Sequence, residues 1–244
     1  MNYALTLRGL CDEELSRIHA GALASVQAWA RATVNCGSLL QCWIRGQDVV
    51  MGQRYPDPDV TDRRSGYQFF YHSHRHGVQE HGHVHIFYHA TASGQRRYLG
   101  REKTPWKRTA PTHLFAIGLD NRGLPVSLFC VNHWVTDGHW IDSQTTQSIV
   151  KRLKIHSADS DFSESAEWIT GFTVMYLPVI EKLLKERDLL ITRQTGSLSE
   201  TLKDQSLEVL CAIEINWLKD VRKLETESAR RNGSKSAPPP IRVA

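Results

Sequence analysis

Histidine is concentrated in one short part of this chain. Seven of the 12 histidines fall between residues 72 and 89, in the segment His-Ser-His-Arg-His-Gly-Val-Gln-Glu-His-Gly-His-Val-His-Ile-Phe-Tyr-His. Imidazole is the commonest transition-metal ligand in proteins, and its charge changes near neutral pH. The segment therefore predicts a metal site.

The spacing of these histidines arranges them in pairs. Alternate side chains of a strand share a face, so His72 lies on the same side as His74, and His83 on the same side as His85. A hairpin that sets His74 opposite His83 also sets His72 opposite His85, with cross-strand Cβ atoms roughly 5 Å apart. These four residues form the predicted core of the site. A slip of one residue would move the two pairs to opposite faces.

The type of ligand limits the metal. A nitrogen-rich set favours transition metals over magnesium and calcium, and we expect iron or zinc, with copper or manganese as alternatives. Three histidines with Glu80 would suit a catalytic centre that keeps a position open for water or substrate. Glu80 is then either a ligand or a general base. The alternative is that the histidines face solvent or hydrogen-bond one another.

Three further residues are candidates for this site. His113 begins one predicted strand and His133 ends the next, and a hairpin brings those two ends together. The two histidines would form a second pair or complete the first site, although an ordinary structural role is the alternative for each. Asp137 would orient a ligating histidine, or only stabilise a turn before Gly138.

Hydrophobic periodicity predicts the elements that position these residues. Three- and four-residue spacing indicates a helix from Asp12 to about Val34, followed by a short helical piece. A long helix is expected from Asp161, perturbed at Pro178, and a last helix from Asn216. Alternating or β-branched segments predict strands at residues 49–51, 66–74, 81–90, 113–120, 124–133 and 207–215, with a loop at residues 55–58.

This order of elements predicts an α+β fold. The antiparallel sheet is built from two central hairpins plus a C-terminal strand, and N- and C-terminal helices flank it. Residues 1–228 are expected to form a single domain, and residues 229–244 a disordered, basic and proline-rich tail.

Composition excludes several classes of protein. The net charge of +4 on 244 residues is mild and the basic residues are scattered, so we expect no nucleic-acid partner. No apolar run is long enough to span a bilayer, and no signal peptide is apparent, so no membrane partner is expected. The five cysteines are odd in number and widely spaced, which argues against a disulfide framework and favours a cytoplasmic location. Oligomeric state is left open.

The order of several motifs resembles an uncharacterised bacterial family of domains of unknown function. The likeness covers most of residues 10–225, and its motifs are Tyr67-Gln68-Phe69-Phe70-Tyr71-His72-Ser73-His74-Arg75, Glu80-His81-Gly82-His83-Val84-His85-Ile86-Phe87, Asn132-His133-Trp134-Val135-Thr136 and Leu207-Glu208-Val209-Leu210. It implies a single α+β domain and a shared histidine site, and it names no reaction. His76 and the basic tail depart from the family pattern.

A second resemblance is local. His74, His76 and Glu80 have the H-x-H-x3-E spacing of the first metal motif of cupins, which implies cupin-like oxygenase chemistry. Phe87 stands where that motif has glycine, and the second cupin motif is missing. The sequence also lacks the serine-hydrolase elbow, the phosphate-binding loop and the H-E-x-x-H helix.

The residues together predict a histidine-rich metalloprotein. We expect a transition-metal-dependent enzyme of the oxygenase or hydrolase type that acts on a small molecule. The alternative is a non-catalytic module that binds metal, responds to pH or packs against a partner.

Overall fold

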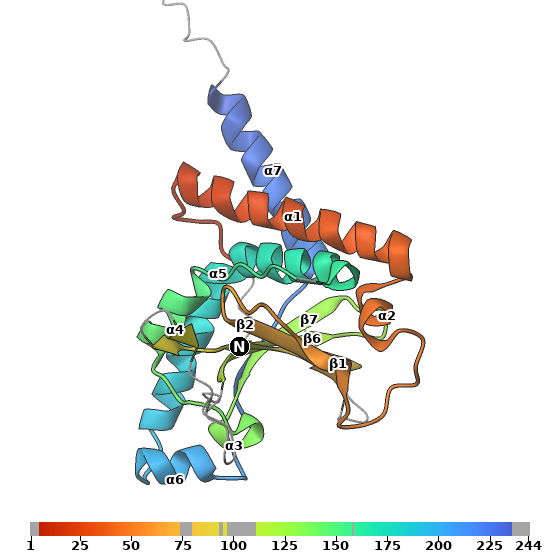
Figure 1. Cartoon of the computed structure of the whole chain (residues 1–244). Coiled ribbons are helices and arrows are strands. Elements are labelled where there is room, and N and C mark those ends of the chain that lie inside the picture. Colours follow the sequence, from red (N-terminus) through yellow and green to blue (C-terminus); the bar gives the residue numbers. More distant parts are fainter. Residues whose placement is uncertain (1–4, 74–79, 93–94, 97–110, 158, 236–244) are drawn as a thin grey trace, which may run out of the picture.

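The computed structural model describes residues 5–73, 80–92, 95–96, 111–157 and 159–235. It shows the predicted α+β fold, in which helices pack on a six-stranded antiparallel sheet of strand order β1-β2-β3-β6-β7-β8 (Figure 1). The strands of this sheet are β1 (Arg54–Thr61), β2 (Tyr67–His72), β3 (Gly82–Tyr88), β6 (Thr112–Leu119), β7 (Pro125–Val131) and β8 (Val209–Glu214). A separate two-stranded ribbon joins β4 (Thr91–Ala92) and β5 (Gln95–Arg96).

The helices fall into two groups. Those that build the layer above the sheet in Figure 1 include α1 (Asp12–Cys36), α2 (Leu39–Ile44), α5 (Ser163–Thr192) and α7 (Trp217–Lys235). The others are shorter: α3 (His133–Thr136), α4 (Ser143–Val150), the 3-10 turn η1 (Ser160–Phe162) and α6 (Leu198–Lys203). No described helix has the length and apolar character needed to cross a membrane.

Two glycines allow α1 and α5 to cross closely. A Cβ added to Gly21 would lie 2.8 Å from the carbonyl oxygen of Gly171, and one added to Gly171 would lie 2.7 Å from the backbone nitrogen of Ser25. Backbone therefore packs on backbone at this crossing, and any larger residue would push the helices apart.

The two faces of the sheet have different neighbours. Phe69, Tyr71 and Ile117 belong to the main hydrophobic core between the sheet and the helices, where Phe69 and Tyr71 contact Trp43 of α2. Their alternating neighbours point the other way, where Ala116, Phe129 and Val131 form a smaller cluster. Figure 1 shows α3 on this second side of the sheet. The predicted histidine site lies on this second face.

The N-terminal part of the sheet differs from the prediction. We expected a strand at residues 49–51 and a loop at 55–58, but β1 begins at Arg54 and includes Pro56 and Pro58. β1 is an edge strand, so its prolines need not donate to a second neighbour, and the register shifts between Tyr55 and Val60.

Several predicted helix details change as well. The long helix was expected from Asp161, but α5 begins at Ser163, and Phe162 precedes it without a side-chain cap. The expected perturbation at Pro178 fits the marked bend of α5 in Figure 1. The last helix, α7, continues to Lys235, so the predicted tail begins inside a helix, and residues 236–244 lie outside the described ones.

A disulfide joins Cys36 and Cys42, which the sequence argument did not expect. Cys36 ends α1 and Cys42 lies within α2, and between the two helices Gly37 adopts a φ of 88° and reverses the chain. Their Cα atoms are therefore 5.3 Å apart, within the usual range for a disulfide.

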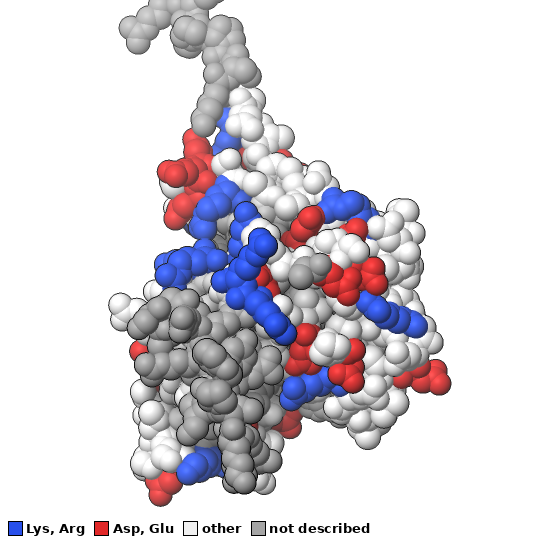
Figure 2. All heavy atoms as spheres, viewed as in Figure 1, with Lys and Arg blue, Asp and Glu red and all other residues white. Residues whose placement is uncertain are grey.

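The surface charge agrees with the mild net charge of +4. On the face shown in Figure 2, basic side chains gather over one region and acidic side chains lie close to them on several sides.

Candidate metal centre

The pairing of β2 with β3 determines which histidines meet. His72 lies opposite His83, and Phe70 lies opposite His85. The predicted register, with His74 opposite His83 and His72 opposite His85, is therefore wrong by two residues. An even shift preserves the face on which a side chain lies, so His72, His83 and His85 still share one face. His74 lies outside the described residues.

The three imidazoles converge through their Nε2 atoms. Nε2 of His72 lies 2.8 Å from Nε2 of His83 and 2.9 Å from Nε2 of His85. The three candidate ligand atoms all lie within 4.8 Å of one another. Nitrogens bound to one transition-metal ion at about 2.0–2.1 Å are about 3.0–3.4 Å apart, so a small expansion of this cluster would admit an ion.

The other ring nitrogen of His83 faces a carboxylate. Nδ1 of His83 lies 2.6 Å from Oε1 of Glu80. A carboxylate accepts hydrogen bonds, so Nδ1 carries the proton and Nε2 presents its lone pair to the centre of the cluster. His83 is only 1% exposed, which makes the charged partner more effective.

His113 holds His85 in a similar way. Nδ1 of His85 lies 2.9 Å from Nε2 of His113. Burial first, and then the electrostatic effects of nearby Arg187 and His83, together lower the pKa of His113 to about 3, so His113 is neutral near pH 7. In the tautomer in which Nε2 of His113 is the acceptor, Nδ1 of His85 carries the proton and Nε2 of His85 presents its lone pair to the cluster.

In this tautomer of His85, the contacts leave at most one proton at the centre of the cluster. Nε2 of His83 and Nε2 of His85 both present lone pairs, and a proton on Nε2 of His72 would have to be shared between them. A cation satisfies all three nitrogens together. The donor set and its outer partners therefore fit a transition-metal ion.

Gly118 makes room for the carboxylate of Glu80. It lies opposite His83 on β6, and a Cβ at this position would lie 2.3 Å from Oε2 of Glu80 and 2.1 Å from Oγ of Ser127. Ser127 donates to Oε2 of Glu80 at 3.3 Å. The carboxylate thus bridges β3 and β7 across a strand that has no side chain at that point.

A β-bulge brings His113 to the site. Strict alternation from Ala116 would place Leu114 on the histidine face and His113 on the helix face. The register between β3 and β6 shifts after Ile86, so His113 lies opposite Phe87, while Leu114 is buried in the main core. His113 thus contacts His85, but it is not among the three described side chains grouped as possible metal ligands.

The cluster borders a cavity of about 570 Å³ on the second face of the sheet. His72 and His85 lie in its lining, and the other lining residues are Gly52, Arg54, Asp59, Gln68, Phe70, Phe87, His89, Pro111, Trp134, Val135, Thr136 and Glu208. His72 is half-buried, whereas His85 is 1% exposed. The accessible side of the cluster therefore faces this cavity.

Helix α3 forms one wall of the cavity. Nε1 of Trp134 donates to the carbonyl oxygen of Leu207 at 3.1 Å, and the side chain of Asn132 donates to the carbonyl oxygen of Thr201 at 2.9 Å. A Cβ on Gly138 would lie 2.1 Å from the carbonyl oxygen of Pro111, so the chain after α3 packs directly on the strand that leads to His113. These contacts fix the chain before and after α3, and so they fix the position of this wall.

Two candidates from the sequence lie apart from the cluster. His133 is the first residue of α3 and is not among the grouped metal-ligating side chains of the described residues. Asp137 caps the end of α3 in a left-handed conformation with a φ of 48°, and its side chain is exposed. Its position is that of a turn residue.

Sequence reasoning missed Gly118, Ser127, Phe129 and Arg54. Phe129 packs edge-on against His83, with ring centroids 5.0 Å apart. Strand alternation could have indicated Gly118 and Ser127, because both lie on the same face of the sheet as the histidines when the strands are paired.

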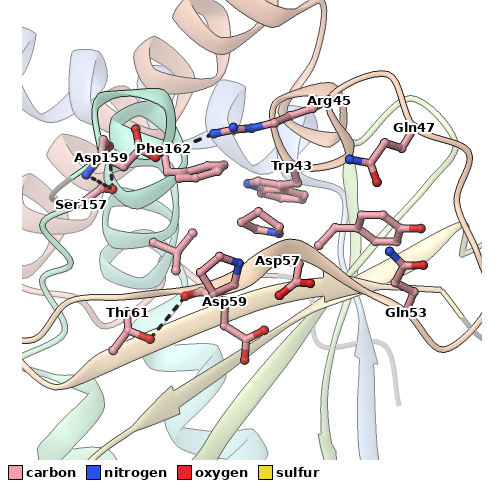
Figure 3. A pocket seen from close by; sticks show the side chains of 14 residues that line it. Trp43, Arg45, Gln47, Gln53, Asp57, Asp59, Thr61, Ser157, Asp159 and Phe162 are labelled. Atoms are coloured by element: carbon pink, nitrogen blue, oxygen red, sulfur yellow. Dashed lines mark hydrogen bonds and ion pairs between the residues drawn. The ribbon is translucent and has the colours of Figure 1, made fainter.

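A second cavity, of about 350 Å³, lies on the other side of β1 (Figure 3). Trp43 and Phe162 lie above the proline-containing strand in this view, and Arg45 reaches past Phe162 toward η1. Its lining contains none of the clustered histidines.

Comparisons with known proteins agree with the resemblance seen in the sequence. A search of curated proteins finds no match, and neither does a search of solved structures. A scan of protein families matches residues 20–215 to a domain of unknown function, DUF6969. The matched range includes every described residue of the histidine cluster. This chain therefore belongs to the DUF6969 family.

Proposed function

We propose that this protein is a metal-dependent enzyme in which His72, His83 and His85 bind one transition-metal ion. The observation that carries the proposal is the convergence of three Nε2 atoms whose rings are held from outside by Glu80 and His113. Metal-ligating histidines commonly donate their other N–H to such an outer partner.

The cavity beside the cluster favours a catalytic centre over a structural one. Structural zinc sites are closed by four protein ligands, whereas catalytic sites have three and keep a position open. Three histidines that could ligate one ion are present among the described residues, and the cluster borders a cavity of about 570 Å³. That volume is in the range typical of small-molecule sites.

Each surrounding residue has a proposed role. Glu80 keeps His83 in the ligating tautomer, so we propose it as a positioning residue in place of the ligand or general base expected from the sequence. His113 does the same for His85. When bound, a transition-metal ion would supply Lewis acidity and lower the pKa of a coordinated water, chemistry that suits hydrolysis or oxygen-dependent reactions. Asp137 has no place in this scheme because it lies on the surface.

A non-catalytic metal-binding or pH-responsive module is the second candidate. It is favoured by one observation, that Nε2 of His72 lies within hydrogen-bond distance of both Nε2 of His83 and Nε2 of His85. A shared proton could therefore hold the cluster together without an ion. Metal content decides between the two candidates.

The test is elemental analysis of untagged protein, purified without chelators in air and under anaerobic conditions. We expect about one equivalent of metal in the wild type and in the His133→Ala variant, because His133 lies outside the cluster. The His83→Ala/His85→Ala double variant should lose it. Protein that stays metal-free after anaerobic reconstitution with iron or zinc would refute the metal proposal.

A further inference from the structure

The cavity beside the histidine cluster has two chemically different regions. One end is formed by His72 and His85, and another region carries the guanidinium of Arg54, with Phe70 between them. The ring of Phe70 lies 5.5 Å from the ring of His72 and 5.4 Å from that of His85. The same ring lies 4.4 Å from Cζ of Arg54. A small molecule that lies across Phe70 would therefore reach both the cluster and Arg54.

Arg54 has hydrogen-bonding capacity available for a ligand. Its ion pair among the described residues joins Nη1 to Oδ2 of Asp59 at 3.5 Å, and its side chain is 59% exposed. A guanidinium has five N–H donors, and two of them form a fork that matches a carboxylate. One long contact leaves this fork largely unused.

Asp59 does not compete strongly for that fork. Its Oδ2 accepts a hydrogen bond of 2.6 Å from Nε2 of Gln68, and Oε1 of Gln68 faces Nε2 of His89. The carboxylate of Asp59 is thus turned toward Gln68 and sits 18% exposed beside Arg54. It orients the guanidinium and leaves part of it facing the cavity.

The rest of the lining suits an apolar body. Phe70 and Phe87 are stacked, with centroids 5.4 Å apart and an angle of 23° between the rings. Trp134 and Val135 of α3 line the same cavity, and both are partly exposed. Flat apolar groups pack well between aromatic surfaces of this kind.

We propose, on the basis of the metal site proposed above, that the cavity binds a small carboxylate with a flat apolar body. The fork of Arg54 binds the carboxylate, the apolar body lies against the partly exposed Trp134 and Val135, and the far end of the molecule reaches the open side of the cluster at His72. Arg54 is the specificity-determining residue because it is the cation among the described lining residues.

The test measures binding of a matched pair of probes by isothermal titration calorimetry. The probes are 3-phenylpropionate and its uncharged amide, 3-phenylpropionamide. Wild-type protein loaded with zinc is compared with Arg54→Gln, Arg54→Lys and the control Gln53→Ala. Gln53 is the neighbouring residue, but it lines the second cavity (Figure 3). Thermal unfolding of each variant establishes that it is folded.

We expect Arg54→Gln to weaken binding of the carboxylate about 10- to 100-fold, because a charge-assisted, forked hydrogen bond is lost. The amide should bind all variants alike, Arg54→Lys should retain part of the preference, and Gln53→Ala should behave as wild type. Equal binding of the carboxylate by wild type and Arg54→Gln, or no binding by wild type, overturns the proposal.

Metal content is measured in every sample, and the titrations are repeated on metal-free protein. If the protein binds one equivalent of metal but Arg54 makes no difference to the preference for the carboxylate over the amide, only the proposed substrate class is refuted. Absence of metal together with an Arg54-dependent preference refutes the metal proposal and keeps the carboxylate site.

Discussion

Replacing Glu80 tests whether the outer partners of the cluster control its metal affinity. Oε1 of Glu80 lies 2.6 Å from Nδ1 of His83, and Oε2 accepts from Ser127 at 3.3 Å. Glu80→Ala removes the acceptor, so Nδ1 of the buried His83 loses its partner and the ring loses its fixed tautomer. Glu80→Gln keeps an oxygen of the same size but removes the charge.

The expected magnitude follows from these contacts. Loss of an outer partner of a ligating histidine lowers metal affinity about 10- to 100-fold, which corresponds to about 1.4–2.7 kcal/mol. Glu80→Ala should approach the upper limit because His83 is 1% exposed and water has little access to replace the carboxylate. Glu80→Gln should lower the metal affinity about tenfold, since a neutral acceptor forms a hydrogen bond roughly half as strong as a charged one.

The assay is competition for zinc between the protein and a chromophoric chelator. Asp137→Asn is the matched control, because both Glu80 and Asp137 were predicted from the sequence as residues of the site, whereas Asp137 lies on the surface at the end of α3. Its zinc affinity should equal that of the wild type. If Glu80→Ala binds zinc as tightly as the wild type, the role assigned to Glu80 is wrong.

Three other predictions concern the surroundings of the site and the stability of the fold. Gly118→Ala should weaken zinc binding about as much as Glu80→Ala in the same assay, because the added methyl would displace the carboxylate from a position 2.3 Å away; unchanged affinity would mean that the carboxylate can move without consequence. Asp62→Asn should lower the free energy of unfolding by about 1–3 kcal/mol near pH 7. Burial alone would raise the pKa of Asp62, but hydrogen bonds from a serine hydroxyl and from backbone N–H groups outweigh it and hold the pKa below its usual value. The difference between the variant and the wild type should therefore shrink as the pH falls below about 4 in urea titrations, because the wild-type carboxyl becomes protonated; a difference independent of pH would contradict this cause. Ser165→Ala should lower the free energy of unfolding by about 1–3 kcal/mol in the same titrations, because Nε1 of the buried Trp43 donates to Oγ of Ser165 at 2.8 Å and would lose its acceptor. An unchanged free energy of unfolding would show that the indole finds another partner.

The main elements of the fold could be predicted because their signals are local. The three- and four-residue periodicity of the first helix and the alternation from Leu207 to Ile215 each follow from neighbouring residues, and α1 and β8 form where expected. The prolines at 56 and 58 misled the prediction for β1. Whether a proline is tolerated in a strand depends on whether the strand lies at an edge, and strand order is a property of the whole sheet.

The same distinction applies to the disulfide. Cys36 and Cys42 are six residues apart, a separation that by itself does not predict contact. The positive φ of Gly37 and the start of α2 at Leu39 turn the chain back on itself and bring the two sulfurs together.

Sequence by itself determined that histidines gather on one face of a strand. The H-x-H spacing at His83 and His85 requires a shared face in any strand, and any even register keeps His72 on that face too. Tertiary structure alone decided which partners complete the site. A bulge after Ile86 turns His113 toward His85, the missing side chain of Gly118 admits Glu80, and the position of α3 forms the cavity. These features depend on contacts between strands and helices far apart in the chain, and local spacing carries no information about them.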